Sequence, residues 1–401
     1  MSYVQHGTGA FRKTSLAFFA AGFTTFAILY FTQALMTEFS KEFRISPTEA
    51  SLSLSVTTIT LAFGMLVMGS LSEAWGRKPI MVVSLLAVSI VTVLAAFSPS
   101  YYVLLAFRIV QGIALAGVPA VAMAYLGEEI DPNHLGVAMG LYISGNSIGG
   151  MGGRIITGML TDAYNWHIAV AVLGAICFIA SVLFWLILPR SKHFQPRPLN
   201  LGELMGTLFT QCRNPGLLRL YGIGFLLMGG FVTMYNYIGY QLIGPPYSLS
   251  QSLVGWIFLI YMVGTFSSTW IGRLSDQYGR HRMMWISILI IIVGACMTLH
   301  GSLWFKIFGI AAFTFGFFGG HSIASSWVGR FAGREKAQAS ALYLFFYYIG
   351  SSIWGTAGGP FWTSFGWLGV VGLILALSVL AFLVSVGLAS KERQHILKHQ
   401  A

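Results

Sequence analysis

Two arginines, Arg108 and Arg154, lie inside long apolar stretches of this sequence. A charge within a membrane-spanning helix costs about 2.5 kcal/mol or more on insertion scales, so each guanidinium must face protein or water. Two such cations suit an anionic or zwitterionic solute, because guanidinium groups bind carboxylates and phosphates through paired hydrogen bonds. For Arg108, a structural role in which it binds backbone carbonyls is the alternative. A third cation, Lys306, lies near a helix end, and we expect its amine to reach the interface.

Carboxylates do not accompany these arginines. All twelve Asp and Glu residues lie outside the apolar stretches or at their ends. His321 lies inside an apolar stretch, and histidine ordinarily titrates near neutral pH, so it is the predicted proton site. A packing histidine held by a hydrogen bond is the alternative.

Tyrosines and amides on the same stretches complete a candidate path for solute and protons. Aromatic walls with a few polar groups suit amphipathic ligands, although ordinary packing explains many such residues equally well. The predicted path residues are Tyr30, Gln33, Arg108, Gln111, Tyr142, Asn146, Arg154, Tyr235, Asn236, Tyr237, Tyr240, His321 and Tyr347.

No catalytic pattern accompanies this path. The sequence has no Walker A motif, nucleophile elbow or metal-ligand spacing, and Cys177, Cys212 and Cys296 are scattered along it. We therefore predict that the protein is not an enzyme and has no cofactor or metal, and that an ion gradient, with protons the leading candidate, drives any uphill transport.

The composition indicates which elements must position these residues. Of the 401 residues, 56% are hydrophobic and 9% charged, whereas soluble domains carry about 25% charged residues. A spanning helix needs about 20 apolar residues. The sequence predicts an all-α membrane protein with twelve such helices, near 15–36, 51–71, 80–97, 102–126, 135–160, 166–188, 218–240, 251–272, 283–300, 303–327, 336–361 and 366–389.

The distribution of basic residues predicts how the chain is oriented in the membrane. If the N-terminus is inside, 18 of the 23 Lys and Arg residues lie in inner segments and only Lys41 and Arg44 in outer loops. This bias predicts that both termini are cytoplasmic. The net charge of +11 is then an orientation signal and not a nucleic-acid surface. The first apolar run lacks a cleavage pattern, so we expect it to be retained.

The two halves of the sequence repeat each other. The stretch GSLSEAWGRK from Gly69 matches GRLSDQYGRH from Gly272, and residues 141–166 match residues 342–367. We therefore predict two parallel six-helix bundles, 1–188 and 218–389, joined by a cytoplasmic linker, 189–217, and followed by a cytoplasmic tail, 390–401.

The repeated stretch resembles motif A of the major facilitator superfamily, G-x-L-x-D-x-x-G-R-[RK]. Twelve spans, duplicated halves and an inner linker extend the resemblance over the whole chain, which implies the major facilitator fold. In that family the motif closes the inner side of the protein, with its acidic residue paired to basic residues and to a helix N-terminus. The first copy departs from the pattern by having Glu where Asp is usual. The implied gate residues are Gly69, Glu73, Gly76, Arg77, Asp276, Gly279 and Arg280.

Two further stretches resemble other motifs of this superfamily and indicate a subgroup within it. The stretch RIVQG from Arg108 resembles motif B, whose arginine is linked to proton transfer in related antiporters. The stretch from Gly140 to Gly150 resembles motif C of the antiporter branch, with Asn146 replacing the usual proline. Close helix packing is the alternative for these glycines. Together they are similar to the drug-efflux-like subgroup of arabinose-efflux and YnfM type.

These observations predict a monomeric secondary transporter in the bacterial inner membrane, whose partners are a small organic solute and the lipid bilayer. Proton-coupled efflux of amphipathic compounds is the leading hypothesis. An exchanger or uniporter for an organic anion bound by Arg108 and Arg154 is the first alternative. A solute sensor that does not transport is the second.

Overall fold

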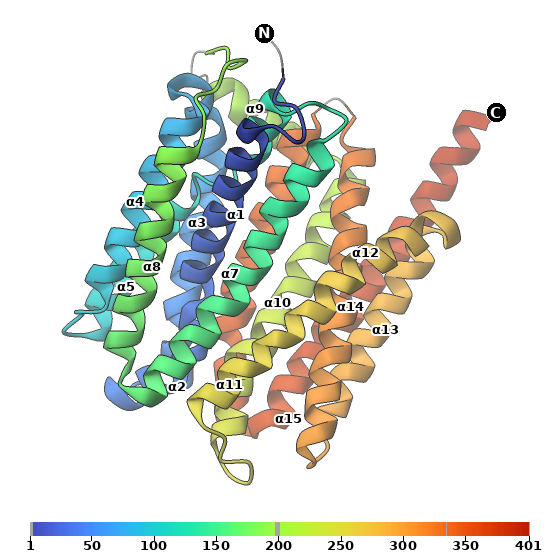
Figure 1. The fold of residues 1–401 in the computed structure, drawn as a ribbon. Helices are drawn as coiled ribbons and strands as arrows, with labels where there is room; N and C mark the ends of the chain where they lie inside the picture. The colour runs from blue at the N-terminus through green and yellow to red at the C-terminus, as the bar shows by residue number, and fades with distance from the viewer. Residues whose placement is uncertain (1–2, 197–200, 334, 401) are drawn as a thin grey trace. The chain divides into compact units, whose positions relative to one another are not determined.

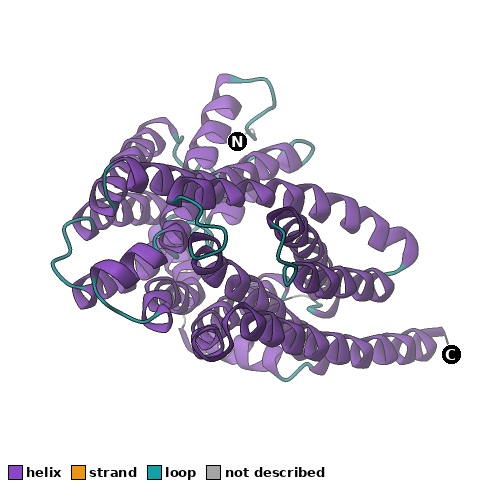
Figure 2. Ribbon diagram, turned by 90° about the horizontal axis from the view of Figure 1, so that it is seen from below, coloured by secondary structure: helices purple, strands orange, loops and turns teal. Residues whose placement is uncertain are grey.

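The computed structural model describes residues 3–196, 201–333 and 335–400, which form helices joined by short loops (Figures 1 and 2). The elements are α1 (Gly9–Tyr30), η1 (Phe31–Ala34), α2 (Met36–Glu42), α3 (Pro47–Trp75), α4 (Arg77–Ala95), α5 (Tyr101–Leu115), α6 (Ala122–Glu129), α7 (Leu135–Ala163), α8 (Trp166–Ile187), α9 (Leu201–Cys212), α10 (Pro215–Ile243), α11 (Gln251–Ile257), η2 (Phe258–Ile260), α12 (Tyr261–Tyr278), α13 (Arg280–Met297), α14 (Leu303–Phe331) and α15 (Lys336–Gln400).

Within the described residues, nine helical stretches are long and apolar enough to cross a membrane. The stretch Lys336–Leu388 contains two of the predicted spans, which meet at Gly366, where φ is +58° and ψ is −145°. A positive φ is a conformation that glycine adopts without the steric cost of a Cβ. Helix α7 is less apolar because it carries several glycines and Arg154, but its 29 residues are long enough to span.

The predicted fourth span is interrupted. It was expected as one helix over 102–126, but α5 ends at Leu115 and α6 begins at Ala122. Pro119 lies in the interruption, and proline has no backbone N–H and clashes with the carbonyl four residues earlier. With these two pieces counted as one span, the twelve predicted spans are all helical.

The predicted linker contains a helix that was not predicted from the sequence. Helix α9 occupies Leu201–Cys212, while residues 197–200 of the linker lie outside the described residues. The predicted tail begins within α15, and its last residue, Ala401, is also outside them.

The chain divides into two compact units, which we describe separately. Unit 1 comprises Met1–Ile45, Leu52–Leu201 and Ser248–Phe258, and unit 2 comprises Ser46–Ser51, Gly202–Tyr247 and Leu259–Ala401. In unit 1, α1 packs against α7 and α8, and α4 packs against α5 and α8. In unit 2, α10 packs against α15, and α14 packs against α12 and α13.

Glycines at every fourth position of α7 set its distance from α1. A Cβ added to Gly145, Gly149 or Gly153 would lie less than 3.0 Å from backbone atoms of Phe19, Phe23 or Ala27, respectively. Small residues at this spacing let two helices approach closely inside a membrane. These glycines of the motif C stretch, together with Gly153, therefore hold α1 and α7 in contact.

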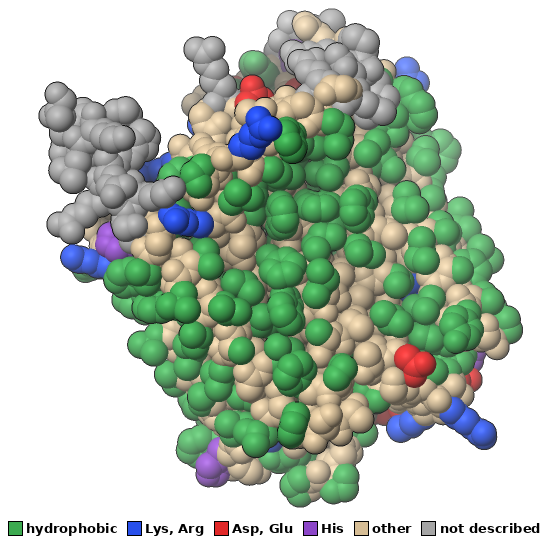
Figure 3. Space-filling view, turned by 180° about the vertical axis from the view of Figure 1, so that it is seen from behind, with side chains coloured by type: hydrophobic (Ala, Val, Ile, Leu, Met, Phe, Trp, Pro, Cys, Tyr) green, Lys and Arg blue, Asp and Glu red, His purple; other side chains and the backbone are tan. Residues whose placement is uncertain are grey.

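Apolar side chains cover the middle of the face shown in Figure 3, and charged side chains lie toward its ends. Large exposed residues include Phe97, Tyr102, Leu186 and Trp304, each more than 65% exposed. Such exposure is expected where the surrounding solvent is lipid.

Candidate functional site

Arg108 lies on α5 and is fully buried. Its Nε donates to Ser53 O at 2.7 Å, and its Nη1 and Nη2 donate to Ile28 O and Leu29 O at 2.9 and 2.8 Å. The last carbonyls of a helix have no partners within that helix, and Ile28 and Leu29 belong to the final turn of α1. Arg108 therefore ties the end of α1 to α3 and α5.

Gln111 extends this network. Its Oε1 accepts a hydrogen bond from Arg108 Nη1 at 2.7 Å, and its Nε2 donates to Thr92 Oγ1 of α4 at 2.9 Å. The structure thus joins these two predicted path residues, one turn apart on α5. Their partners are backbone carbonyls and neutral side chains within unit 1.

Arg154 is also fully buried, on α7, and its surroundings are aromatic. Its Nε donates to Gln33 Oε1 at 3.0 Å, and its Nη1 donates to Gly150 O at 2.6 Å. The guanidinium carbon lies 4.6 Å from the ring centroids of both Tyr30 and Phe258. Cation–π contacts of this kind stabilise a guanidinium, more strongly where water is excluded. Three predicted path residues, Tyr30, Gln33 and Arg154, therefore meet at one place.

The segment Ser248–Phe258 belongs to unit 1, and its Phe258 ring contacts Arg154. The amides of Gln251 and Ser252, at the start of α11, donate to the Asp162 carboxylate at the end of α7, at 3.1 and 2.7 Å. A Cβ on Gly158 would lie 3.0 Å from Gln251 O, so α7 and α11 are in close contact. The segment Ser248–Phe258 therefore packs against α7, and its Phe258 ring covers one face of the Arg154 guanidinium.

Asn146 and Tyr142 lie farther along α7, toward its N-terminus. A Cβ added to Gly22 of α1 would lie less than 3.0 Å from atoms of both residues. The Tyr142 ring meets Phe18 edge-on, with centroids 6.0 Å apart. These two predicted path residues therefore lie at the α1–α7 contact.

In unit 2, His321 is the centre of an aromatic cluster. Its Nδ1 lies 2.9 Å from the Tyr343 hydroxyl, and its ring centroid lies 4.7 Å from that of Tyr347. Phe317, one turn away, lies parallel to the imidazole at 6.0 Å. The structure therefore brings His321 together with Tyr347 on α15 and adds Tyr343 as its hydrogen-bond partner.

The α10 residues contact different neighbours. Tyr235 Oη is 2.7 Å from Thr314 Oγ1, and the Tyr235 ring contacts Phe231 and Tyr261. By contrast, Asn236 Nδ2 and Tyr237 Oη donate to the carbonyl of Gly355 at 3.3 and 3.0 Å. Tyr240 lies beside Tyr237 and Trp362 at the helix end.

The first copy of the repeated loop motif, the first corner (Gly69–Lys78), is held by a second helix. Gly76 turns the chain between α3 and α4 with φ +100°. Arg77 Nη2 lies 2.8 Å from Glu128 of α6, and Arg77 Nη1 donates to Ser72 Oγ at 2.7 Å. Glu73 is more distant, at 3.9 Å, and its side chain is 45% exposed. The closest carboxylate to Arg77 is therefore outside the motif. A Cβ on Gly69 would meet open space, so this glycine is not required sterically.

The neighbouring Glu129 holds the start of the linker. It is 2% exposed and accepts hydrogen bonds from Ser191 Oγ and from the amides of Lys192 and His193, at 2.7, 2.6 and 2.8 Å. The two glutamates at the end of α6 therefore have separate partners.

The second copy, the second corner (Gly272–His281), has fewer contacts. Gly279 turns the chain with φ +92°, as Gly76 does. Arg280 lies 3.4 Å from Asp276, whose side chain is 68% exposed. In the described part of the chain, the buried Nε and Nη1 of Arg280 have no hydrogen-bond partner.

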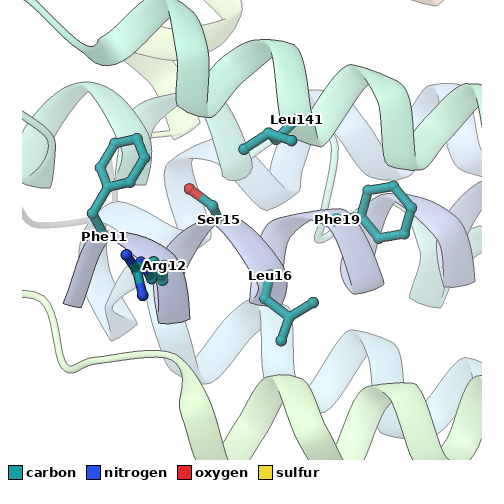
Figure 4. Close-up of a pocket in the computed structure, with 6 residues that line it drawn as sticks. All are labelled: Phe11, Arg12, Ser15, Leu16, Phe19 and Leu141. Carbon is teal, nitrogen blue, oxygen red and sulfur yellow. The ribbon is translucent and has the colours of Figure 1, made fainter. Parts of the chain in front are cut away.

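A shallow groove of about 390 Å³ lies between α1 and α7 (Figure 4). In that view Arg12 and Phe19 lie toward opposite ends of the row of side chains, and Leu141 reaches toward it from α7. No predicted path residue lines this groove. The lining residues are Phe11, Arg12, Ser15, Leu16, Phe19 and Leu141.

Comparison with known proteins decides the family. The family model of the Major Facilitator Superfamily matches residues 14–245 and 222–399. The chain belongs to the Major Facilitator Superfamily. It is a membrane transporter with the major facilitator fold, in agreement with the fold predicted from the repeated motif.

Relatives within this superfamily cover nearly the whole chain. The uncharacterized MFS-type transporter YybF of Bacillus subtilis is 57% identical over 97% of this chain and 96% of its own length. The inner membrane transport protein YnfM of Escherichia coli is 47% identical over 96% and 93%. The multi-drug resistance efflux pump PmrA of Streptococcus pneumoniae is 26% identical over 79% and 80%.

Among solved structures, an inward-facing, occupied bacterial homolog of the human lysosomal transporter Spinster matches with a TM-score of 0.76 and 16% identity, covering 96% of this chain and 98% of its own. At that identity the match describes the major facilitator fold alone.

Several residues that contact the predicted site were not among the site residues predicted from the sequence. Phe258 has no distinguishing signal, because it is one of 31 phenylalanines. Asp162 was recognised only as an acid at a helix end. Glu128 was also recognised as an acid at a helix end, where a solvated and a gate-pairing role were both open, and the matching stretch of the second half, Gly329-Arg330-Phe331, contains no acid.

Proposed function

We propose that this protein is a proton-coupled exporter of small amphipathic organic compounds that works by alternating access in a bacterial inner membrane. The observation that carries the proposal is the His321 cluster, where an imidazole within a spanning helix contacts a tyrosine hydroxyl and aromatic rings. A histidine can exchange protons near neutral pH, and the surrounding rings suit an amphipathic ligand. The similarity to PmrA supports export. The bias in basic residues supports cytoplasmic termini, and we propose that the protein acts as a monomer.

The test begins with a thermal-shift screen of purified protein against amphipathic compounds. Hits are then assayed in proteoliposomes with and without a pH gradient. We expect wild-type uptake to follow the gradient and His321→Gln to lose that dependence while counterflow exchange continues. His300→Gln is the matched control, because His300 is exposed in the turn between α13 and α14.

Two outcomes would contradict this proposal. If His321→Gln keeps the full response to the pH gradient, His321 is not the coupling residue. If the wild-type protein binds compounds but shows no counterflow, it is a sensor and not a transporter.

A second candidate function, exchange or uniport of an organic anion, is favoured by the Arg154 geometry. The guanidinium donates to an amide oxygen and a carbonyl and lies against two rings, and a guanidinium can bind a carboxylate or phosphate through paired hydrogen bonds. Arg154→Gln should then weaken the binding of anionic compounds and spare neutral ones. Arg108→Gln should lower thermal stability without discriminating between them, because Arg108 binds backbone carbonyls. Equal affinities of wild type and Arg154→Gln for every anion would remove this candidate.

A further inference from the structure

A second groove, of about 470 Å³, lies in unit 2 among α12, α13 and α14. Its walls are apolar and aromatic, and the Trp270 and Phe315 rings lie 5.9 Å apart in it. Arg282 is the one charged residue among those that line it. The lining includes Trp270, Tyr278, Arg282, Ile286, Ile290 and Phe315.

The polar and apolar parts of this groove are separated along the helices. Arg282 lies in the first turn of α13, and Ile290 lies eight residues farther along, a rise of about 12 Å. Tyr278 ends α12, and Trp270 lies eight residues before it. One end of the groove therefore carries a cation and a phenol, and the other end carries rings and an aliphatic side chain.

These side chains are open to the surrounding medium. Trp270, Tyr278 and Ile286 are 48%, 60% and 45% exposed, and Arg282 is exposed too. The neighbouring Arg280 turns away, with its side chain 13% exposed and paired to Asp276. Arg282 is thus available to a ligand, while Arg280 offsets the nearby carboxylate.

We propose that this groove binds one anionic phospholipid of the inner leaflet. The phosphate contacts Arg282 and the Tyr278 hydroxyl, and one acyl chain lies over Trp270, Ile286 and Ile290. An arginine at a negatively charged leaflet attracts anionic headgroups, and tyrosine and tryptophan favour the membrane interface. The proposal rests on the cytoplasmic orientation of the Gly279 turn, and it is independent of the transported solute.

The experiment is native mass spectrometry of the full chain in detergent, titrated with phosphatidylglycerol or with phosphatidylcholine. We expect wild type to retain one phosphatidylglycerol more tightly than phosphatidylcholine. Arg282→Gln should weaken phosphatidylglycerol binding about fivefold, the loss expected for one basic residue near a lipid surface. Arg273→Gln is the matched control, because Arg273 is exposed on α12 and does not line the groove.

A second variant tests the acyl chain. Ile286→Trp fills the groove without changing its charge, and it should lower retention of both lipids while the thermal midpoint in lipid-free detergent stays unchanged. Equal losses for Arg282→Gln, Arg273→Gln and Arg12→Gln would show diffuse attraction to basic residues and overturn the site. Equal wild-type binding of the two lipids, undiminished retention by Ile286→Trp, or a co-purifying protein at this face would overturn it too.

Discussion

Arg77 and Arg280 follow equivalent glycines in the two copies of one loop motif, and their surroundings differ. Arg77 contacts Glu128 through Nη2 at 2.8 Å and through Nε at 3.2 Å, and it also binds Ser72. Arg280 contacts Asp276 at 3.4 Å. Ser72 and Ser275 donate alike to the carbonyls of Gly69 and Gly272, but Ser72 also accepts a hydrogen bond from Arg77. The first corner is a network across two helix ends, whereas the second is one pair within a single turn.

The difference originates outside the motif. Helix α6 ends with Glu128 and Glu129, whereas α14 ends with Gly329-Arg330-Phe331. A repeated motif therefore does not imply a repeated interaction, because the decisive carboxylate comes from another helix.

The largest expected effect is that of Arg77→Gln. The change removes charge-assisted hydrogen bonds to a largely buried guanidinium, each worth about 1.5–3 kcal/mol, so we expect a loss of about 2 kcal/mol in stability. Arg280→Gln should lower the thermal midpoint in detergent much less. Equal losses for the two variants would show that the corners are equivalent.

The next effect separates the two carboxylates near Arg77. Glu128→Gln should lower the thermal midpoint clearly, because its carboxylate is the one at 2.8 Å. Glu73→Gln should cost less than about 1 kcal/mol, as exposed pairs do, and its effect should shrink with salt. The measurement is thermal unfolding at low and high salt, and a larger loss for Glu73→Gln would contradict the observed geometry.

Features of the fold and the site could be predicted from the sequence where they depend on residues close together in the chain. Hydropathy predicted the spans, because it depends on residues within single segments, while the orientation drawn from the 18-to-2 charge bias stays a prediction. The break between α5 and α6 was missed, although Pro119 marks it. The contacts Arg77–Glu128, Arg154–Gln33 and Arg154–Phe258 join residues 51, 121 and 104 positions apart. Composition and spacing along one helix carry no information on such pairs.

A smaller, local effect is expected from Glu129→Gln, which weakens the link between the end of α6 and the linker. The carboxylate accepts hydrogen bonds from two backbone amides and the Ser191 hydroxyl. Its neutralisation should weaken these bonds, so the start of the linker should detach from α6 more often. Limited trypsin digestion should cleave after Arg190 or Lys192 several-fold faster. Glu128→Gln is the control, because Glu128 contacts Arg77 instead, and cleavage as fast in that variant would show general loosening.

The smallest effect concerns the N-terminal segment, which contacts the loop between α6 and α7. Val4 pairs with the α6–α7 loop, and hydrogen bonds from the Asn133 amide and Gln5 lower the pKa of Asp131 in that loop. A lowered pKa contributes stability that is present above the unfolded-state pKa and is lost as pH falls through the folded-state pKa.

Hydrogen exchange of residues 3–8, compared between wild type and Asp131→Asn at each pH, measures this contribution. We expect protection in wild type to exceed that in the variant at neutral pH and to converge with it in acid. A constant difference between them across the acid range would contradict the assignment to Asp131.

The glycines of α7 have a mechanical consequence. Gly145, Gly149 and Gly153 repeat every four residues along one face, and each permits backbone contact with α1. Rolling α7 about its own axis would bring bulky side chains into that seam, and sliding it would break the register. Neither displacement can occur unless the two helices separate, so α1 and α7 behave as one rigid pair. We therefore expect any displacement of α7 to move α1 with it.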